Sequence, residues 1–376
     1  MRKIKILSIF GTRPEAVKMA PVVKAIENDD RFQSIVLVTA QHREMLDQVL
    51  SAFDIAPDYD LDVMEHGQPL CQITSKVLTG TSSILDEVFP DAVLVHGDTT
   101  TTFAAALAAI YKHIPVGHIE AGMRTGDITQ PFPEELNRLL VARLSQWHFA
   151  ADKQCVRNLK LEGIPSSSIV DLPHNTVVDS LLLAQRIINE RRSVKGHTSV
   201  YCGKRVVATV HRRESWGKQM ESIFEAFVDF SERHPEVRLS VVTHANPKIQ
   251  KMAKRVMGDP PRIELIGHLG YLDFISLLSS ADLIATDSGG VQEEGPTLGV
   301  PVVVLRNKTE YQDLLDKGAI SLAGTKRDKI VEALSFALTD NIMRQVALEV
   351  SQERRNCDST LVILERLHSD LCKMDK

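Results

Sequence analysis

The chain has 376 residues, of which 43% are hydrophobic and 25% are charged, and its formal net charge is -5. This length predicts two domains, because domains of roughly 100–200 residues are typical. The slight acidic excess argues against a general nucleic-acid-binding protein, since binding to phosphates needs a concentrated basic face, but it is compatible with a local basic pocket for a small anion.

The five cysteines form no Cys-x-x-Cys pair, which indicates neither a disulfide framework nor a structural zinc site. Scattered reduced thiols are typical of a cytoplasmic protein. The apolar residues 4–10 run directly into Gly11 without a cleavage-site pattern, so they predict a first strand rather than a signal peptide. Apolar runs stay well short of the ~20 residues of a membrane span, and no membrane association is expected.

β-rich and amphipathic helical runs alternate in the first half of the chain. The spacing predicts strands over residues 4–10, 34–39, 92–96, 116–120 and 147–150. It predicts helices over residues 14–27, 43–53, 72–88, 99–113 and 133–146. This alternation predicts a parallel sheet covered by helices on both faces.

The same alternation starts again after a long helix predicted over residues 175–192. Further strands are predicted over residues 205–210, 239–243, 263–266, 283–285 and 300–305, with helices over 220–233, 271–280 and 291–298 and a helical tail from 326. We therefore expect an α/β protein of two doubly wound domains, with a boundary between residues 170 and 200.

Ligands of open parallel sheets bind at the carboxyl ends of the strands, so the residues after each strand are candidates for the site. Asp98 follows the strand 92–96, Glu120 ends the strand 116–120, and Glu134 falls in the first turn of the next helix. Carboxylates that converge on one edge repel one another, which raises the pKa of at least one. Such a set suits general acid–base chemistry on a sugar-like group.

These acids also have alternative interpretations. Asp98 can serve as a helix N-cap, and Glu134 or Glu135 can serve only to stabilise a helix start. A metal site is the competing chemical interpretation, but neither His-x-x-x-His nor Asp-x-Asp spacing accompanies the acids, so no metal is expected.

Two glycine-containing turns lead into predicted helices and indicate anion sites, because free N–H groups and the helix dipole favour negative charge. The first is Gly11-Thr12-Arg13, with Lys18 nearby, and it matches neither a dinucleotide fingerprint nor a Walker loop. The second is Ser288-Gly289-Gly290, after which Glu294 can accept hydrogen bonds from a ribose diol.

His211 follows the strand 205–210 and stands beside Arg212 and Arg213. Such a histidine can donate to a phosphate or protonate a leaving group, and a surface charge cluster is the alternative. Together these residues indicate a nucleotide-sugar enzyme that needs no metal. Glycosyl transfer, epimerisation and hydrolysis all stay open at this point.

Seven motifs, in order along nearly the whole chain, resemble those of the non-hydrolysing bacterial UDP-N-acetylglucosamine 2-epimerases. The motifs are FGTRPEAVKMAP (10–21), TAQHREMLDQVL (39–50), HGDTT (96–100), GHIEAG (117–122), PEELNR (133–138), HRRE (211–214) and DSGGVQEE (287–294). Each motif alone is weak evidence, but their joint occurrence is specific.

The resemblance implies a GT-B-like fold, in which two Rossmann-like domains form the active site in the cleft between them. On this basis residues 1–174 are expected to carry the acid cluster and residues 175–357 to bind UDP, while a helix over 358–376 returns to the first domain. It also implies a homodimer with no metal or nicotinamide cofactor, and the cysteine pattern described above predicts a cytoplasmic location. The implied reaction interconverts UDP-N-acetylglucosamine and UDP-N-acetylmannosamine, which supplies N-acetylmannosamine for envelope polysaccharides.

In this family the C2 proton is lost, UDP is eliminated to leave 2-acetamidoglucal, and UDP adds back. The resemblance makes Asp98, Glu120 and Glu134 the proton-handling acids and His211 the diphosphate and leaving-group residue. The implied UDP-sugar contacts are Arg13, Lys18, Phe274, Ser288, Gly289, Gly290 and Glu294, and a second, allosteric substrate site would include Gln41, His42 and Arg212.

The departures from the family pattern lie mostly in the second half. Tyr311 stands where an arginine that contacts the ligand is usual, and Arg306 is a candidate substitute. Three further departures are His174, Ser215 and Leu269. They leave open a hydrolysing epimerase or an epimerase for a modified sugar. A retaining glycosyltransferase and a nucleotide-sugar sensor are more distant alternatives, since neither needs three acids.

Overall fold

The computed structural model describes residues 2–40, 43–65, 67–195, 203–210, 217–243, 246–258, 260–267 and 269–374. The chain forms two compact units. The N-terminal unit comprises Met1–Leu183 and Cys357–Lys376, and the C-terminal unit comprises Ala184–Asn356. Each unit contains one parallel sheet with helices on both faces, so the predicted α/β fold of two doubly wound sheets is confirmed.

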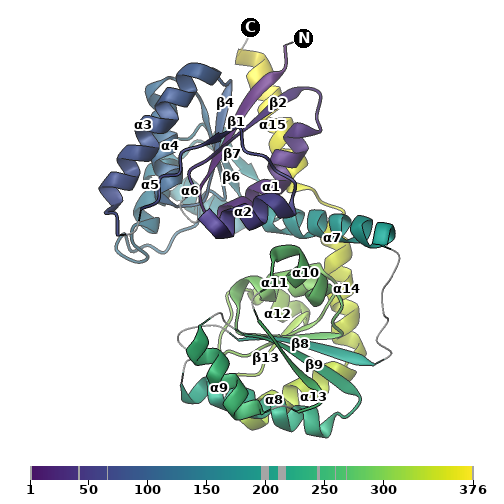
Figure 1. The fold of residues 1–376 in the computed structure, drawn as a ribbon. Helices are drawn as coiled ribbons and strands as arrows, with labels where there is room; N and C mark the ends of the chain where they lie inside the picture. The colour runs from purple at the N-terminus through teal and green to yellow at the C-terminus, as the bar shows by residue number, and fades with distance from the viewer. Residues whose placement is uncertain are drawn as a thin grey trace. The chain divides into compact units, whose positions relative to one another are not determined.

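The sheet of the N-terminal unit has seven strands in the order β3-β2-β1-β4-β5-β6-β7 (Figure 1). Its strands are β1 (Ile4–Phe10), β2 (Phe32–Val38), β3 (Tyr59–Asp60), β4 (Ala92–His96), β5 (Val116–Ile119), β6 (Trp147–Ala150) and β7 (Ile169–Asp171). All residues of β4 and β5 are buried, as expected for central strands of a sheet that is covered on both faces. The strand order reverses next to β1, which places the switch point between β1 and β4.

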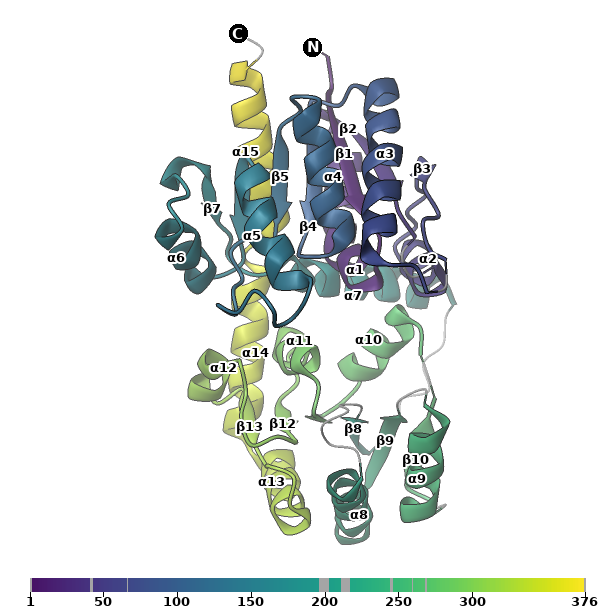
Figure 2. The ribbon, with the colours of Figure 1, turned by 90° about the vertical axis from the view of Figure 1, so that its left-hand side faces the viewer.

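The helices of this unit are α1 (Arg13–Glu27), α2 (Arg43–Ala52), α3 (Leu70–Val88), α4 (Thr100–Tyr111), α5 (Glu134–Leu144), α6 (Lys153–Leu161) and α15 (Ser359–Met374), together with the start of α7 (Thr176–Lys195). Helix α4 packs between α3 and α5 on one face of the sheet (Figure 2). Its buried alanines, five of which lie between Ala104 and Ala109, allow this close approach. Helix α15 packs against α1, and the indole of Trp147 donates to Asp370 at 2.9 Å.

The sheet of the C-terminal unit has six strands in the order β10-β9-β8-β11-β12-β13. Its strands are β8 (Lys204–Val210), β9 (Val237–Thr243), β10 (Ile263–Ile266), β11 (Leu283–Thr286), β12 (Val302–Val304) and β13 (Ile320–Leu322). Its helices are α8 (Lys218–Arg233), α9 (Pro247–Met257), α10 (Tyr271–Ser279), α11 (Gly289–Thr297), α12 (Gln312–Lys317), α13 (Arg327–Thr339) and α14 (Asn341–Arg355). Helix α8 packs between α9 and α13, whereas α11 packs against α14 on the other face (Figure 1).

Several elements were not predicted from the sequence. Strands β3 and β7 have two and three residues, too few for a readable alternation. Helices α6 and α9 were missed as well, although both begin with a capping side chain that the sequence shows. Asp152 accepts from the Cys155 amide at the start of α6, and Asn246 accepts from the Lys248 amide at the start of α9.

The contacts assign residues 175–183 to the N-terminal unit, whereas the predicted first domain ends at residue 174. The first part of α7 therefore belongs to the N-terminal unit, where Ser180 Oγ donates to the Val17 carbonyl oxygen of α1. Among the described residues, no helix is long and apolar enough to span a bilayer.

Candidate active site

Three predicted acids gather at the carboxyl edge of the N-terminal sheet. Asp98 lies just after β4, Glu120 directly follows β5, and Glu134 is the first residue of α5. Glu120 and Glu134 both lie near enough to Asp98 to raise the pKa of its carboxyl group. The structure therefore brings together the three acids that the sequence selected.

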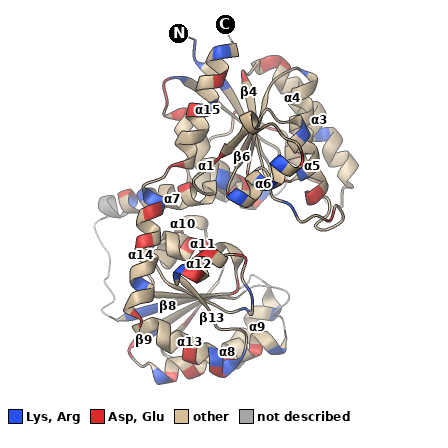
Figure 3. Cartoon of the chain, turned by 180° about the vertical axis from the view of Figure 1, so that it is seen from behind, with Lys and Arg blue, Asp and Glu red and all other residues tan. Residues whose placement is uncertain are grey.

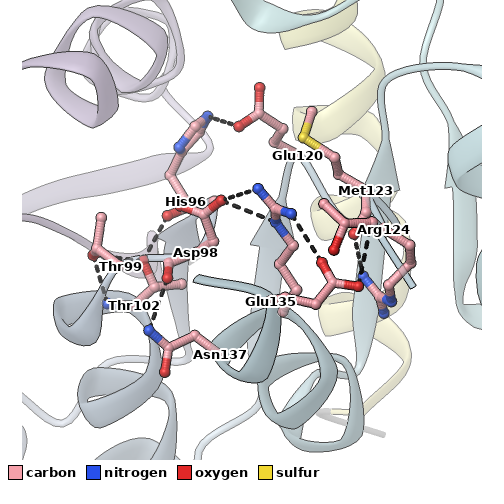
Figure 4. A network of polar contacts seen from close by, with 12 residues as sticks. His96, Asp98, Thr99, Thr102, Glu120, Met123, Arg124, Glu135 and Asn137 are labelled. Atoms are coloured by element: carbon pink, nitrogen blue, oxygen red, sulfur yellow. Dashed lines mark hydrogen bonds and ion pairs between the residues drawn. The ribbon is translucent and has the colours of Figure 1, made fainter. Parts of the chain in front are cut away.

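The carboxylate of Asp98 is held by a guanidinium group (Figure 4). Arg138 donates from Nε and Nη2 to Asp98 Oδ2 at 2.9 and 2.6 Å, and the Asn137 amide donates to the Asp98 carbonyl oxygen at 2.8 Å. Burial raises the pKa of Asp98, Arg138 lowers it, and the neighbouring glutamates raise it again. The net shift is upward, so Asp98 takes up a proton more readily than an exposed aspartate.

Glu135, rather than Glu134, is the acid that stabilises this part of the fold. Its Oε2 accepts from Arg138 at 2.9 Å, and its Oε1 accepts from the backbone amides of Thr125 and Gly126 at 3.0 and 3.1 Å. Glu135 thus connects the loop after β5 to the arginine that holds Asp98. Arg138 was not among the predicted site residues, although its spacing of three residues from Glu135 on a helix is a usable signal for an ion pair.

Glu120 is buried and has a different environment. Its Oε1 accepts from the Lys18 ammonium group and also from the Asn175 side-chain amide, at 2.5 Å. Its Oε2 lies 3.9 Å from His96 Nε2. Burial alone would raise the pKa of Glu120, but Lys18 and the other donors lower it to about 2. One acid of the cluster is therefore shifted upward and another downward, which is the usual way to keep a proton donor and a proton acceptor together.

The backbone at Glu120 is held in a sparsely populated conformation. Its φ of 65° lies in the left-handed region, which costs a non-glycine residue of the order of 1 kcal/mol. Helix α6 supports the turn that follows. Asn158 donates to the Gly122 carbonyl oxygen at 2.9 Å, and a Cβ on Gly122, whose φ is 92°, would lie 2.4 Å from the Cys155 carbonyl oxygen. Glycine is therefore required here for the Glu120 turn to pack on α6.

Two buried histidines flank the acids. Burial lowers the pKa of His96 to about 4 and that of His118 to about 3. His118 Nε2 lies 2.7 Å from the carbonyl oxygen of Gly97, in the turn that carries Asp98. Both rings are therefore neutral in the folded protein near neutral pH.

These histidines predict that acid destabilises the protein. The unfolded chain binds their protons below its ordinary pKa of 6.5, whereas the folded chain resists protonation down to about pH 4 and 3. Stability is therefore complete above pH 6.5 and is lost as the pH falls, by about 2 kcal/mol per histidine at pH 5. Urea unfolding at pH 7 and pH 5 should show a smaller loss for His118→Gln than for the wild type, and an unchanged loss for the exposed control His113→Gln. Equal losses in all three proteins would contradict this origin.

At the predicted anion site, the start of α1, the structure shows an internal partner for two backbone amides. The amides of Gly11 and Thr12 were expected to be free for a ligand, but both donate to Glu15 Oε2, at 3.0 and 2.7 Å. The helix N-terminus therefore already holds an anion from its own chain. Of the two predicted cations, Lys18 is paired with Glu120, and Arg13 is half-buried.

In the C-terminal unit, β11 leads into Ser288, which is the N-cap of α11. Gly289 and Gly290 form the first turn, and a Cβ on Gly290 would lie 3.7 Å from Glu294 Oε1. The four residues predicted to contact UDP here, Ser288, Gly289, Gly290 and Glu294, thus lie on the first turns of one helix.

Phe274 lies half-buried on α10. Acidic residues are prominent on α11 and α12 (Figure 3).

Three glutamates lie near Tyr311. Burial raises the pKa of its hydroxyl group, and Glu293, Glu310 and Glu294 raise it further, so it is a neutral hydrogen-bonding group. The proposed substitute cation, Arg306, donates to both carboxylate oxygens of Glu310, at 2.8 and 3.2 Å. Its charge is therefore already partly neutralised within the unit.

Two further departures from the family pattern, His174 and Leu269, lie among the described residues. The ring of His174 is buried, with Nε2 3.2 Å from the Cys357 carbonyl oxygen and Nδ1 3.0 Å from Ser359 Oγ, so it joins the start of α15 to the segment that leads into α7. Leu269 is half-buried. The predicted residues Gln41, His42, His211, Arg212 and Ser215 lie outside the described residues. Among the residues that the structure does describe, no group of three or more His, Cys, Asp and Glu could hold a metal ion.

Comparisons with known proteins identify related chains. Residues 24–355 match a family model described as UDP-N-acetylglucosamine 2-epimerase. A UDP-N-acetylglucosamine 2-epimerase of Yersinia pestis is 47% identical over 343 residues, which is 90% of this chain and 91% of that protein. One of Bacillus subtilis is 43% identical over 340 residues, covering 90% of this chain and 88% of that protein. The crystal structure of the Neisseria meningitidis UDP-GlcNAc 2-epimerase bound to UDP-GlcNAc is 37% identical, covers 97% of this chain and 99% of that chain, and superposes with a TM-score of 0.84.

Proposed function

Because this chain belongs to the UDP-N-acetylglucosamine 2-epimerase family, we propose that it interconverts UDP-N-acetylglucosamine and UDP-N-acetylmannosamine without hydrolysis. The observation that carries the proposal is the pair Asp98 and Glu120 on one sheet edge, with pKa values shifted in opposite directions. Inversion at C2 needs one group that removes a proton and another that returns a proton to the opposite face.

In the proposed reaction, a carboxylate takes the proton from C2 and the C1–O bond breaks, so that its electron pair leaves on the UDP oxygen. The product of this half-reaction is 2-acetamidoglucal, with a double bond between C1 and C2. The UDP oxygen then attacks C1, and a carboxylic acid returns a proton to C2 from the other face. No atom is gained or lost overall, and water must not reach C1.

Asp98, Glu120 and Glu134 are the proposed proton-handling residues. Arg138 orients Asp98, and Lys18 and Asn175 orient Glu120. Neither Glu120 nor Asp98 is tied by the geometry to one face of the sugar, and both are needed for inversion.

The contacts proposed for UDP follow the family resemblance. They are His211 and Arg13 for the diphosphate, Ser288, Gly289 and Gly290 at the start of α11, Glu294 for the ribose and Phe274 near the base, with Lys18 shared between Glu120 and the ligand. The α11 start supports this assignment, because backbone N–H groups at a helix N-terminus favour a phosphate. The resemblance alone supports a homodimer and a supply of N-acetylmannosamine to envelope polysaccharides, which we propose on that ground.

Proton NMR of the purified protein with UDP-N-acetylglucosamine in heavy water tests the proposal. We expect UDP-N-acetylmannosamine to accumulate with deuterium at C2, because the abstracted proton exchanges with solvent. Free N-acetylmannosamine together with UDP would instead establish a hydrolysing enzyme, and the altered surroundings of Tyr311 would then be the first place to look for water entry. An unchanged spectrum would contradict the substrate, and Tyr311→Arg would test whether a missing cation is responsible.

A further inference from the structure

Glu15 is a buried carboxylate that connects two turns at the catalytic edge of the N-terminal sheet. It is 3% exposed. Its Oε2 accepts from the amides of Gly11 and Thr12, in the turn after β1, at 3.0 and 2.7 Å. Its Oε1 accepts from Thr99 Oγ1 at 2.6 Å and lies 3.1 Å from Thr102 Oγ1, both at the start of α4.

The two carboxylate oxygens of Glu15 make contacts with different parts of the unit. The Oε2 contacts are those of a capping box, in which a glutamate in the first turn of α1 bonds back to the preceding amides. A capping box needs nothing from another helix. The Oε1 contact with Thr99 is therefore an additional connection, and it joins α1 to the turn between β4 and α4.

That turn carries Asp98, and it is held at both ends. On one side, Thr102 Oγ1 donates to the His96 carbonyl oxygen at 2.6 Å. A hydroxyl group has only one hydrogen, so this short bond uses it, and Thr99 is the principal donor to Glu15. On the other side, Thr99 directly follows Asp98 and is fixed by Glu15. The backbone at Asp98 thus lies between two anchored residues.

We propose that Glu15 is a positioning residue for Asp98: through Thr99 it fixes the turn that presents the Asp98 carboxylate at the sheet edge. The inference rests on the proposed function, in which Asp98 handles the C2 proton. The N-terminus of α1 then binds the carboxylate of Glu15, and this carboxylate fixes the position of the acid cluster through Thr99. A displacement of a reacting group by about 1 Å can lower a rate by about 10²-fold. Loss of the contact between Glu15 and Thr99 should therefore lower mainly kcat.

The variants Glu15→Ala, Glu15→Gln and Thr99→Val test the proposal, with Thr81→Val as the matched control. Thr81 is fully buried on α3 in the same unit, and among the described residues its hydroxyl group has no hydrogen-bond partner. We expect Glu15→Ala to lower kcat for C2 epimerisation by about 10²-fold with KM changed less than about threefold. Glu15→Gln should recover part of kcat, because an amide oxygen still accepts from two amides and its NH₂ group faces the hydroxyls.

Non-additivity separates positioning from general destabilisation. Thr99→Val should lower kcat, and the loss in the double variant Glu15→Ala/Thr99→Val should be smaller than the product of the two single losses, because both changes break the bond between Thr99 and Glu15. Thr99→Val also removes the N-cap bond to the Thr102 amide, which Glu15→Ala leaves in place. Thr81→Val should keep the wild-type kcat. Additive losses, an equal loss in Thr81→Val, or a wild-type kcat in Glu15→Ala would each overturn the proposal.

Amide hydrogen exchange gives a readout that does not need the reaction. Without substrate, Glu15→Ala and Thr99→Val should speed exchange at residues 97–103 by about tenfold, whereas Thr81→Val should leave this segment unchanged. If the wild type fails to epimerise, the proposed function fails while this exchange result still tests the connection. If the wild type is active and residues 97–103 exchange at wild-type rates in Glu15→Ala, the positioning role is wrong.

Discussion

Asp98→Asn and Glu120→Gln are each expected to lower the epimerisation rate by about 10³-fold, while the affinity for UDP changes by less than about threefold. An amide keeps the size of a carboxylate but cannot take or return a proton, and general acid–base groups contribute about 10²–10⁴-fold to a rate. The proposed UDP contacts are largely in the C-terminal unit, and these substitutions leave them in place.

The measurement is C2 deuterium incorporation by NMR, with UDP affinity from titration calorimetry. Asp86→Asn is the matched control, because Asp86 is an exposed acid of the same unit that pairs with Lys112 on the surface. Wild-type turnover in both variants would remove these acids from the mechanism. Loss of UDP affinity together with turnover would show that they act in binding.

Arg138→Leu is expected to cost about 3 kcal/mol of folding stability and also to lower turnover. Arg138 pairs with Asp98 and Glu135, and its removal leaves the nearly buried carboxylate of Glu135 without its cation. Breaking one partner of a buried ion pair typically costs about 3–5 kcal/mol, because the remaining charge stays desolvated. Urea unfolding measures the loss of stability.

The same variant should shift the pH dependence of the reaction. Arg138 lowers the pKa of Asp98 against the effects of burial and of Glu120, so without Arg138 this pKa rises. In the direction of the reversible reaction in which Asp98 removes the C2 proton, its carboxylate is then ionised only at higher pH, and the acid limb of that kcat/KM profile should move upward. Arg143→Leu, an exposed change on the same helix, should alter neither stability nor profile. A variant that loses stability with an unmoved acid limb would show that Arg138 supports the fold without acting on Asp98.

Parts of the site could be predicted because they depend on chain order alone. Residues at the carboxyl ends of parallel strands meet on one edge, so Asp98 after β4 and Glu120 after β5 had to lie close together once the strands were recognised. The Ser288-Gly289-Gly290 turn was predicted on the same ground, since it directly follows β11. In each case a local pattern is sufficient, because the strand and the residue that follows it are adjacent in the chain.

Other parts of the site depend on partners that are distant in the sequence. The Gly11-Thr12 turn looked like an empty anion site, but the carboxylate of Glu15 fills it and reaches on to Thr99. Lys18 looked like a ligand contact, yet it is paired with Glu120, about a hundred residues further along the chain. A charged side chain has several partners within reach of its length, and only the packed fold selects among them.

The α/β class, the two parallel sheets and the acids at the strand ends could be predicted from hydrophobic periodicity and strand order, because both are properties of the chain. The pKa shifts of those acids follow from the folded structure alone. Asp98 and Glu120 are similar carboxylic acids that follow neighbouring strands, and their pKa values move in opposite directions. Burial, the ion pair with Lys18 and the repulsion among the three acids cause these shifts, and all three depend on distances in space that a sequence does not contain.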